Sequence, residues 1–197
     1  MNNSMNGPHD QLTASDLVIT HRGTVYPWQC DHMGHMNVMW YNGKFDESSW
    51  QLLSTLGLTA ERFKSERFGM AAVEQRVHYK RELHAGDLIT IRSGILEIGN
   101  KSLRVIHEMR HDPSGDLAAC MVAVGVCVDA ATRQSRLLPD DVRKRAYLQT
   151  HRTGERDETS VVSKVTAESA ARPASQTSRA NRNLVGEILE AMFCPTT

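Results

Sequence analysis

The stretch DHMGHMN, residues 31–37, gathers more side chains suited to catalysis than any other part of the chain. It combines a carboxylate, two imidazoles, a glycine and an amide directly before a predicted helix. The free N–H groups and the positive dipole end of a helix N-terminus stabilise a developing oxyanion. A carboxylate beside them can attack a carbonyl carbon or activate a water molecule. The stretch therefore indicates acyl-transfer hydrolysis, with Asp31 as the reacting group.

Other interpretations of these residues stay open. Aspartate often precedes a helix as a turn or capping residue, so Asp31 also has a purely structural explanation. His32 and His35 are conceivable zinc ligands, but no third ligand follows at a recognisable spacing. The sequence has no GxSxG elbow, no GxxxxGK[ST] phosphate loop and no GxGxxG dinucleotide turn. We therefore expect neither a metal nor a cofactor.

A long helix is predicted over residues 38–56, immediately after this stretch. Asn37 is well suited to cap it, and Gly57 is a plausible stop. Its helical stripe consists of Val38, Tyr41, Phe45, Ser49, Leu52 and Leu56. Ser48 and Ser49 make the middle of the helix slim, which lets a sheet approach its backbone closely.

Five strand-like segments surround this helix in the sequence. The first covers residues 17–28 and is interrupted near Gly23; the others cover 69–83, 88–98, 102–111 and 117–128. The apolar parity of 88–98 changes around Gly94, which predicts a bulge. The last segment is nearly all apolar, as expected of a central strand. One helix must cover one face of the sheet, which predicts an α+β fold, with residues 139–148 as a closing helix.

Composition and charge limit the classes of protein. The 197 residues suit one domain, which we place at 15–150, between a disordered N-terminus (1–14) and a mostly disordered tail (151–197) with a possible short helix at 183–193. Lys plus Arg equals Asp plus Glu, 23 each, which argues against nucleic acid or an acidic membrane as partner. Four cysteines without a CxxC pair, and the lack of a signal or membrane-spanning segment, predict a soluble cytoplasmic protein.

Two runs of sequence resemble a known family. VYPWQCDHMGHMNVMWYNGKFDE, residues 25–47, is similar to the signature of hotdog thioesterases of the 4-hydroxybenzoyl-CoA thioesterase type. In that family an aspartate precedes a Gly-His-Val/Met-Asn stretch, and the helix then carries a tyrosine and a Phe/Met-Asp/Glu pair. The positions in register are Asp31, Gly34, His35, Asn37, Tyr41, Phe45 and Asp46. YKRELHAGD, residues 79–87, resembles the family's Tyr-x-Arg-x-x-x-x-Gly-Asp segment, and the resemblance extends over about residues 16–148.

The resemblance implies a hotdog fold, an antiparallel sheet wrapped around one long helix, and Asp31 as nucleophile or general base. In acyl-carrier-protein thioesterases of similar fold, an aspartate, a histidine four residues later and a glutamate share the work, and Asp31, His35 and Glu82 match them. Those enzymes carry an asparagine where this chain has Met33. Family members assemble as dimers with each active site at the subunit interface, which implies a homodimer or homotetramer in which Asp31 and Glu82 meet across chains.

The expected activity is hydrolysis of an acyl-coenzyme A thioester, with Gly34, Asn37 and Tyr41 as substrate-binding residues. Backbone N–H groups around Gly34 and the helix start are the expected oxyanion donors. Asn37 is alternatively only a helix cap, Tyr41 a core residue, and Glu82 a solvated surface residue. Two rival functions are a hotdog hydratase and a non-catalytic acyl-thioester-binding protein. The hydratase pattern Asp-x-Asn-Pro-x-His differs from this chain, which lacks the proline and has a shorter Asp-to-His spacing.

Overall fold

The computed structural model describes residues 17–151. Its elements in chain order are β1 (Val18–Thr24), the 3-10 turn η1 (Pro27–Gln29), α1 (Val38–Thr55), α2 (Ala60–Ser65), β2 (Phe68–Tyr79), β3 (Leu88–Ile98), β4 (Ser102–His111), β5 (Leu117–Asp129) and α3 (Asp140–His151). The predicted N-terminal segment 1–14 and the predicted short helix 183–193 lie outside these residues, so the domain boundaries stay a prediction.

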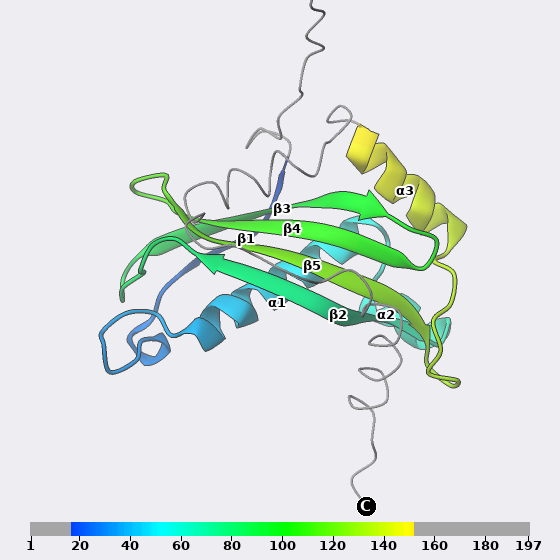
Figure 1. Ribbon diagram of the computed structural model, residues 1–197, viewed down its shortest axis with the longest axis horizontal. Coiled ribbons are helices and arrows are strands. Elements are labelled where there is room, and N and C mark those ends of the chain that lie inside the picture. The colour runs from blue at the N-terminus through cyan, green and yellow to red at the C-terminus, as the bar shows by residue number, and fades with distance from the viewer. Residues whose placement is uncertain (1–16, 152–197) are drawn as a thin grey trace, which may run out of the picture.

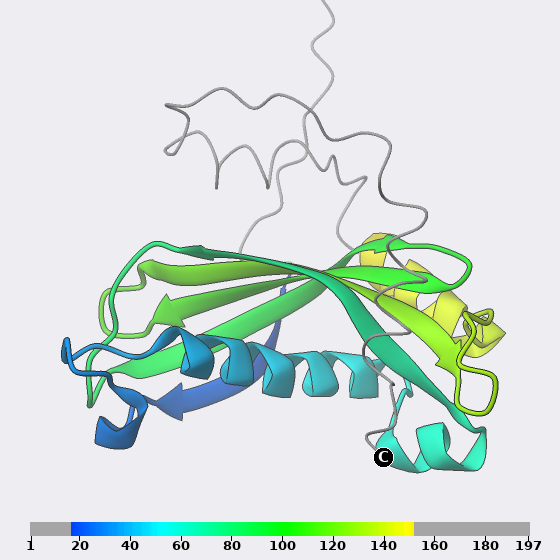
Figure 2. The ribbon, with the colours of Figure 1, turned by 60° about the horizontal axis from the view of Figure 1, so that its bottom comes forward.

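The five strands form one antiparallel sheet in the order β1-β3-β4-β5-β2. The sheet curves around α1, which runs along its concave face (Figures 1 and 2). The predicted α+β hotdog arrangement is confirmed. As expected, β5 lies inside the sheet, between β4 and β2. The predicted bulge in β3 is confirmed by a shift in the β3–β4 register between Ile95 and Glu97.

The helix α1 forms as its sequence predicts. The Asn37 side chain accepts a hydrogen bond from the Met39 N–H, and the chain leaves the helix through Gly57 at φ +79°. Phe45, Leu52 and Leu56 are fully buried and pack into the core formed with β3, β4 and β5. Ser48 is also fully buried, so the slim middle of the helix does lie against the sheet.

Two predicted strand boundaries were wrong. The strand expected over 17–28 ends at Thr24 and is followed by η1, because Pro27 has no N–H to donate to a ladder. The strand expected over 69–83 ends at Tyr79, since the N–H groups of Lys80 and Arg81 both turn to Ala118 O. Glu82 therefore lies in the loop 80–87 and not on a strand. The short helix α2, capped by Thr59, was not predicted.

The helix α3 closes one end of the molecule, as predicted for residues 139–148. Arg62 of α2 donates two hydrogen bonds of 2.8 Å to the carboxylate of Asp141 in α3, and this bidentate pair ties the two helices together. Among residues 17–151, no helix has the length and apolar composition needed to cross a bilayer.

Candidate functional site

The loop before α1 is a tight turn organised by Asp31. The Asp31 N–H donates to His35 O at 3.0 Å, and the Gly34 N–H donates back to Asp31 O at 3.0 Å. Gly34 has φ +85°, a conformation in which glycine avoids the strain of a side chain. The Asp31 carboxylate accepts a hydrogen bond from the Met33 N–H through Oδ1. The turn role considered for Asp31 is therefore real, and within residues 17–151 it leaves Oδ2 without a hydrogen-bond donor.

His35 lies between two carboxylates. Its Nδ1 is 3.8 Å from Asp31 Oδ1, and its Nε2 is 3.8 Å from Glu82 Oε1. The three predicted catalytic residues, called here the Asp31 cluster, thus come together within one chain. The His35 side chain is about one quarter exposed, so it is open to solvent.

Backbone pairing between two loops builds the Asp31 cluster. His35 and His84 form an antiparallel bridge, and the Met36 N–H donates to Leu83 O at 2.6 Å. The side chain of Leu83 is fully buried, which anchors the loop 80–87 to the core. The expected meeting of Asp31 with Glu82 across two chains is not needed for this arrangement. Glu82 approaches His35 in its own chain, while most of its side chain stays in solvent.

The structure assigns structural work to the other predicted residues. Asn37 caps α1, as its alternative interpretation held. Tyr41 is in the core, where its hydroxyl donates to Arg81 O at 3.2 Å and its ring meets Tyr79 edge-on. Burial raises the pKa of Tyr41 to about 12, so its hydroxyl stays protonated and holds the loop that carries Glu82.

The expected oxyanion donor at Gly34 is already occupied. Its N–H group donates to Asp31 O, so it does not point freely at a substrate. At the start of α1, the Met39 N–H is bonded to the Asn37 side chain and the Trp40 N–H to Asn37 O. The Val38 N–H, at the first position of the helix, donates to no group in the described part of the chain. It is the better candidate donor.

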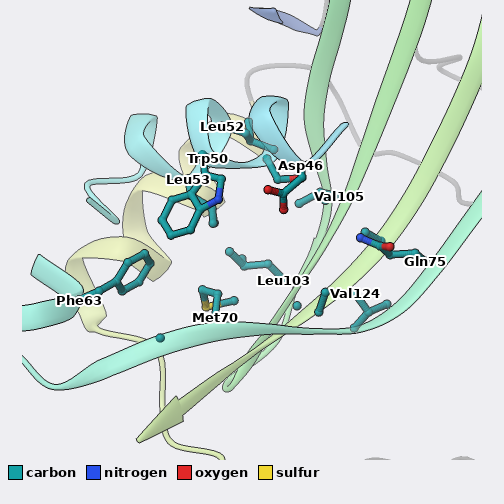
Figure 3. A pocket seen from close by; sticks show the side chains of 15 residues that line it. Asp46, Trp50, Leu52, Leu53, Phe63, Met70, Gln75, Leu103, Val105 and Val124 are labelled. Atoms are coloured by element: carbon teal, nitrogen blue, oxygen red, sulfur yellow. The ribbon is translucent and has the colours of Figure 1, made fainter. Parts of the chain in front are cut away.

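A cavity of about 310 Å³ lies between the second half of α1 and the strand β2. We call it the α1–β2 cavity; its lining residues are Asp46, Ser49, Trp50, Leu52, Leu53, Phe63, Gly69, Met70, Ala72, Gln75, Leu103, Val105, Ala123, Val124 and Gly125. Figure 3 shows Trp50 and Phe63 at one side, Met70 on β2, and Asp46 reaching in from the helix. Sequence reasoning missed this cavity; the serines that narrow α1 were its only local signal.

A buried hydrogen-bond chain runs from this cavity into the core. Ser49 Oγ lies 3.1 Å from His107 Nε2, His107 Nδ1 lies 2.6 Å from Ser93 Oγ, and Ser93 Oγ lies 2.6 Å from Thr20 Oγ1. Burial lowers the pKa of His107 to about 4, so its ring is neutral near neutral pH. Sequence reasoning missed His107, although it shares the inward parity of Val105 and Met109 on β4.

The fold and the Asp31 cluster together define a hotdog-type domain with a carboxylate–imidazole site. Residues 25–146 match the model of the thioesterase-like superfamily, and the chain belongs to that superfamily. The resemblance carried by the two sequence runs is thereby confirmed. Among curated proteins, no sequence matches this chain.

Solved structures with the same fold share little sequence with this chain. A Staphylococcus aureus protein in complex with coenzyme A is 19% identical, with TM-score 0.68 over 81% of this chain and 97% of its own. A 1,4-dihydroxy-2-naphthoyl-CoA thioesterase from Synechocystis is 19% identical, with TM-score 0.60 over 66% of this chain and 95% of its own. A gentisyl-coenzyme A thioesterase is 23% identical, with TM-score 0.57 over 64% of this chain and 98% of its own.

Proposed function

We propose that this protein hydrolyses an acyl-coenzyme A thioester to the free acid and coenzyme A, with Asp31 as nucleophile or general base. The observation that carries the proposal is the Asp31 cluster at the N-terminus of α1 in a member of the thioesterase-like superfamily. Asp31 has one carboxylate oxygen engaged in the turn and one without a donor among residues 17–151. The first oxygen can therefore hold the orientation of the carboxylate while the second reacts.

Two routes fit this geometry. In one, Asp31 removes a proton from water, the oxygen bonds to the thioester carbon, and the C–S bond breaks to release the thiolate. In the other, Asp31 itself attacks, the C–S bond breaks, and water then hydrolyses the mixed anhydride. A thiol near the cysteine pKa of about 8.5 leaves readily as thiolate, so no strong general acid is required. The Val38 N–H and the positive end of α1 would stabilise the oxyanion.

His35 would position the reacting groups. Its two nitrogens face the carboxylates of Asp31 and Glu82, each at 3.8 Å, which leaves room for small adjustments when substrate or water enters. A histidine in this place can orient the attacking water. It can also relay the proton that Asp31 takes from that water toward Glu82, which is largely in solvent.

We also propose that the working unit is a homodimer, or a homotetramer built from it, in which the Asp31 cluster of one chain serves the α1–β2 cavity of the other. Within one chain the two are far apart. Asp46, the first cavity residue on α1, is nine positions after Asn37, a rise of about 13 Å along the helix. The cavity lies beside the first half of β2, whereas loop 80–87 follows its end.

A two-fold axis resolves this separation. In the described sheet β2 is an edge strand, so its outer backbone groups are open to a second copy. Antiparallel pairing of two β2 strands would bring the end of one beside the beginning of the other, and with it the Asp31 cluster beside the partner's cavity.

The three described cysteines are free thiols, which supports the proposed cytoplasmic location.

A thiol-release assay across a panel of acyl-coenzyme A substrates tests the activity. The panel should contain short, medium and long chains and small aromatic acyl groups, because two structural relatives are named as aromatic acyl-CoA thioesterases. We expect release of one thiol per free acid. Water addition to an enoyl thioester without thiol release would indicate a hydratase instead, and binding without either reaction a carrier.

Activity is expected to survive exhaustive chelation. The proposed oxyanion donors are backbone N–H groups, so no Lewis acid takes part in the reaction. The measurement is kcat after dialysis against a chelator, followed by addition of zinc. Loss of activity that zinc restores would make His32 and His35 ligands and remove the metal-free mechanism.

Mixing two inactive variants tests the shared site. One chain carries Asp31→Asn; the other carries Leu53→Trp, which fills the α1–β2 cavity from a half-buried position. If the cluster of one chain serves the cavity of the other, each mixed dimer contains one complete site, and mixing restores a substantial fraction of wild-type activity. A site contained within one chain predicts no recovery from the same mixture. Co-refolding or co-expression provides the exchange of subunits, and size exclusion verifies dimers.

A further inference from the structure

The buried hydrogen-bond chain, Ser49–His107–Ser93–Thr20, crosses a core that consists mainly of apolar side chains. His107 and Ser93 are fully buried and Thr20 nearly so. Burying unpaired polar groups would destabilise the fold by about 2–7 kcal/mol each. Here every member has a partner, and the chain ends at Ser49, which lines the α1–β2 cavity. A purely structural chain has no need to end there.

The chain can run in either direction because it ends on a carbonyl at both ends. Ser49 Oγ can donate to Phe45 O at 2.9 Å, and Thr20 Oγ1 can donate to Ile91 O at 3.4 Å. If His107 carries its proton on Nε2, it donates to Ser49 and accepts from Ser93. If the proton is on Nδ1, every bond reverses and Ser49 donates to His107. The neutral ring permits both tautomers.

Because the hydrogen-bond chain can run in either direction, Ser49 can either donate a hydrogen bond to a ligand or accept one from it. When His107 donates to it, the Ser49 hydroxyl can turn from Phe45 O to a carbonyl or hydroxyl oxygen in the cavity. In either direction, a lone pair on Ser49 Oγ can accept from a ligand hydroxyl. The remaining lining is mostly apolar, and among the lining residues of the described chain Asp46 alone carries a charge. That carboxylate disfavours an anionic ligand.

We propose that Ser49, backed by this chain, determines specificity by binding a neutral hydroxyl or carbonyl oxygen on the acyl group in the α1–β2 cavity. The inference rests on the proposed function and names its substrate class: a compact acyl group with an apolar body and an uncharged oxygen. The volume fits such a group, since the cavity measures about 310 Å³ and a dry cavity of about 150 Å³ already admits benzene.

Ligand binding without catalysis provides the first test. The full-length protein is titrated with phenol, toluene and benzoate, and binding is followed by NMR through the imidazole resonances of His107. Phenol and toluene have nearly the same shape, so their ratio isolates the hydroxyl. We expect phenol to bind up to about tenfold more tightly than toluene, the scale of one net hydrogen bond, and to shift the His107 signals; benzoate should bind most weakly.

The adjacent serines offer a matched pair of variants. Ser48 and Ser49 both donate back to the helix, at 2.8 Å to Lys44 O and 2.9 Å to Phe45 O, but only Ser49 lines the cavity. Ser49→Ala should abolish the preference for phenol, whereas Ser48→Ala should retain it. Thermal unfolding of both variants controls for general damage to α1.

Kinetics provide the second test. Isomers of hydroxybenzoyl-CoA are compared with the matching methylbenzoyl-CoA, and the ratio of kcat/KM should favour the hydroxyl by up to about tenfold in wild type and Ser48→Ala but not in Ser49→Ala. Failure of every thioester to react would overturn the proposed hydrolysis while leaving the binding result to stand alone. Equal binding of phenol and toluene to wild type, or an unchanged preference in Ser49→Ala, would overturn the role of Ser49.

Discussion

Replacing Asp31 with Asn is expected to lower kcat by at least about 100-fold, the lower end of the usual contribution of a general base. The substitution is informative because Asp31 has two separable roles. Asparagine keeps a side-chain oxygen that can accept the hydrogen bond from the Met33 N–H, so the turn before α1 should persist. What disappears is the negative charge that attacks the thioester or activates water.

The control for this experiment is Asp112→Asn, which removes a carboxylate in the exposed turn between β4 and β5 and should leave kcat unchanged. Circular dichroism and thermal unfolding verify that the Asp31→Asn variant folds. Asp31→Ala should lose both kcat and some stability, because it also removes the acceptor for the Met33 N–H. A folded Asp31→Asn enzyme with near-normal kcat would refute the assigned role.

The second large effect is a loss of stability in acid caused by His107. Its pKa is lowered by burial from 6.5 to about 4 in the folded protein and returns to its ordinary value on unfolding. Between these values the unfolded state binds more protons, so the free energy of unfolding falls as pH falls. The contribution of the neutral His107 ring to the free energy of unfolding is fully present above about pH 6.5 and is lost by about pH 4, a change of about 3 kcal/mol.

Urea denaturation at a series of pH values measures this contribution. Between pH 6.5 and 4.5, the free energy of unfolding should fall by about 2 kcal/mol more in wild type than in His107→Gln. His84→Gln, which removes an exposed histidine, should keep the wild-type pH dependence. If His107→Gln shows the same dependence as wild type, the buried ring is not the group that destabilises the fold in acid.

Much of the fold followed from local patterns. The cap at Asn37, the glycine exit at Gly57 and the helical stripe between them placed α1 correctly. The parity change near Gly94 predicted the bulge found in β3. Of the two strand boundaries that failed, the end of β1 is explained locally, by Pro27 in the turn that follows. The end of β2 was decided by a partner distant in sequence, Ala118 O, which draws the backbone away after Tyr79.

The candidate site also combines residues that local sequence predicted with contacts that depend on distant parts of the chain. Asp31, His35 and Asn37 lie within seven residues, so their types and spacing alone indicated the chemistry. The resemblance added Glu82, but its proximity to His35 depends on the pairing of His35 with His84. The sequence also did not show that the Gly34 N–H donates to Asp31 O, because the folded conformation of the turn determines which of its N–H groups are hydrogen-bonded.

The sequence by itself determined the α1 helix, the meander of strands and the reactive loop before the helix, because caps, periodicity and turn residues act over a few positions. Only the tertiary structure decided the α1–β2 cavity and the buried hydrogen-bond chain. Thr20 meets Ser93 across 73 positions, and Ser49 meets His107 across 58. Such contacts depend on strand order and register, and the neutral state of His107 depends on exclusion of water by the assembled core.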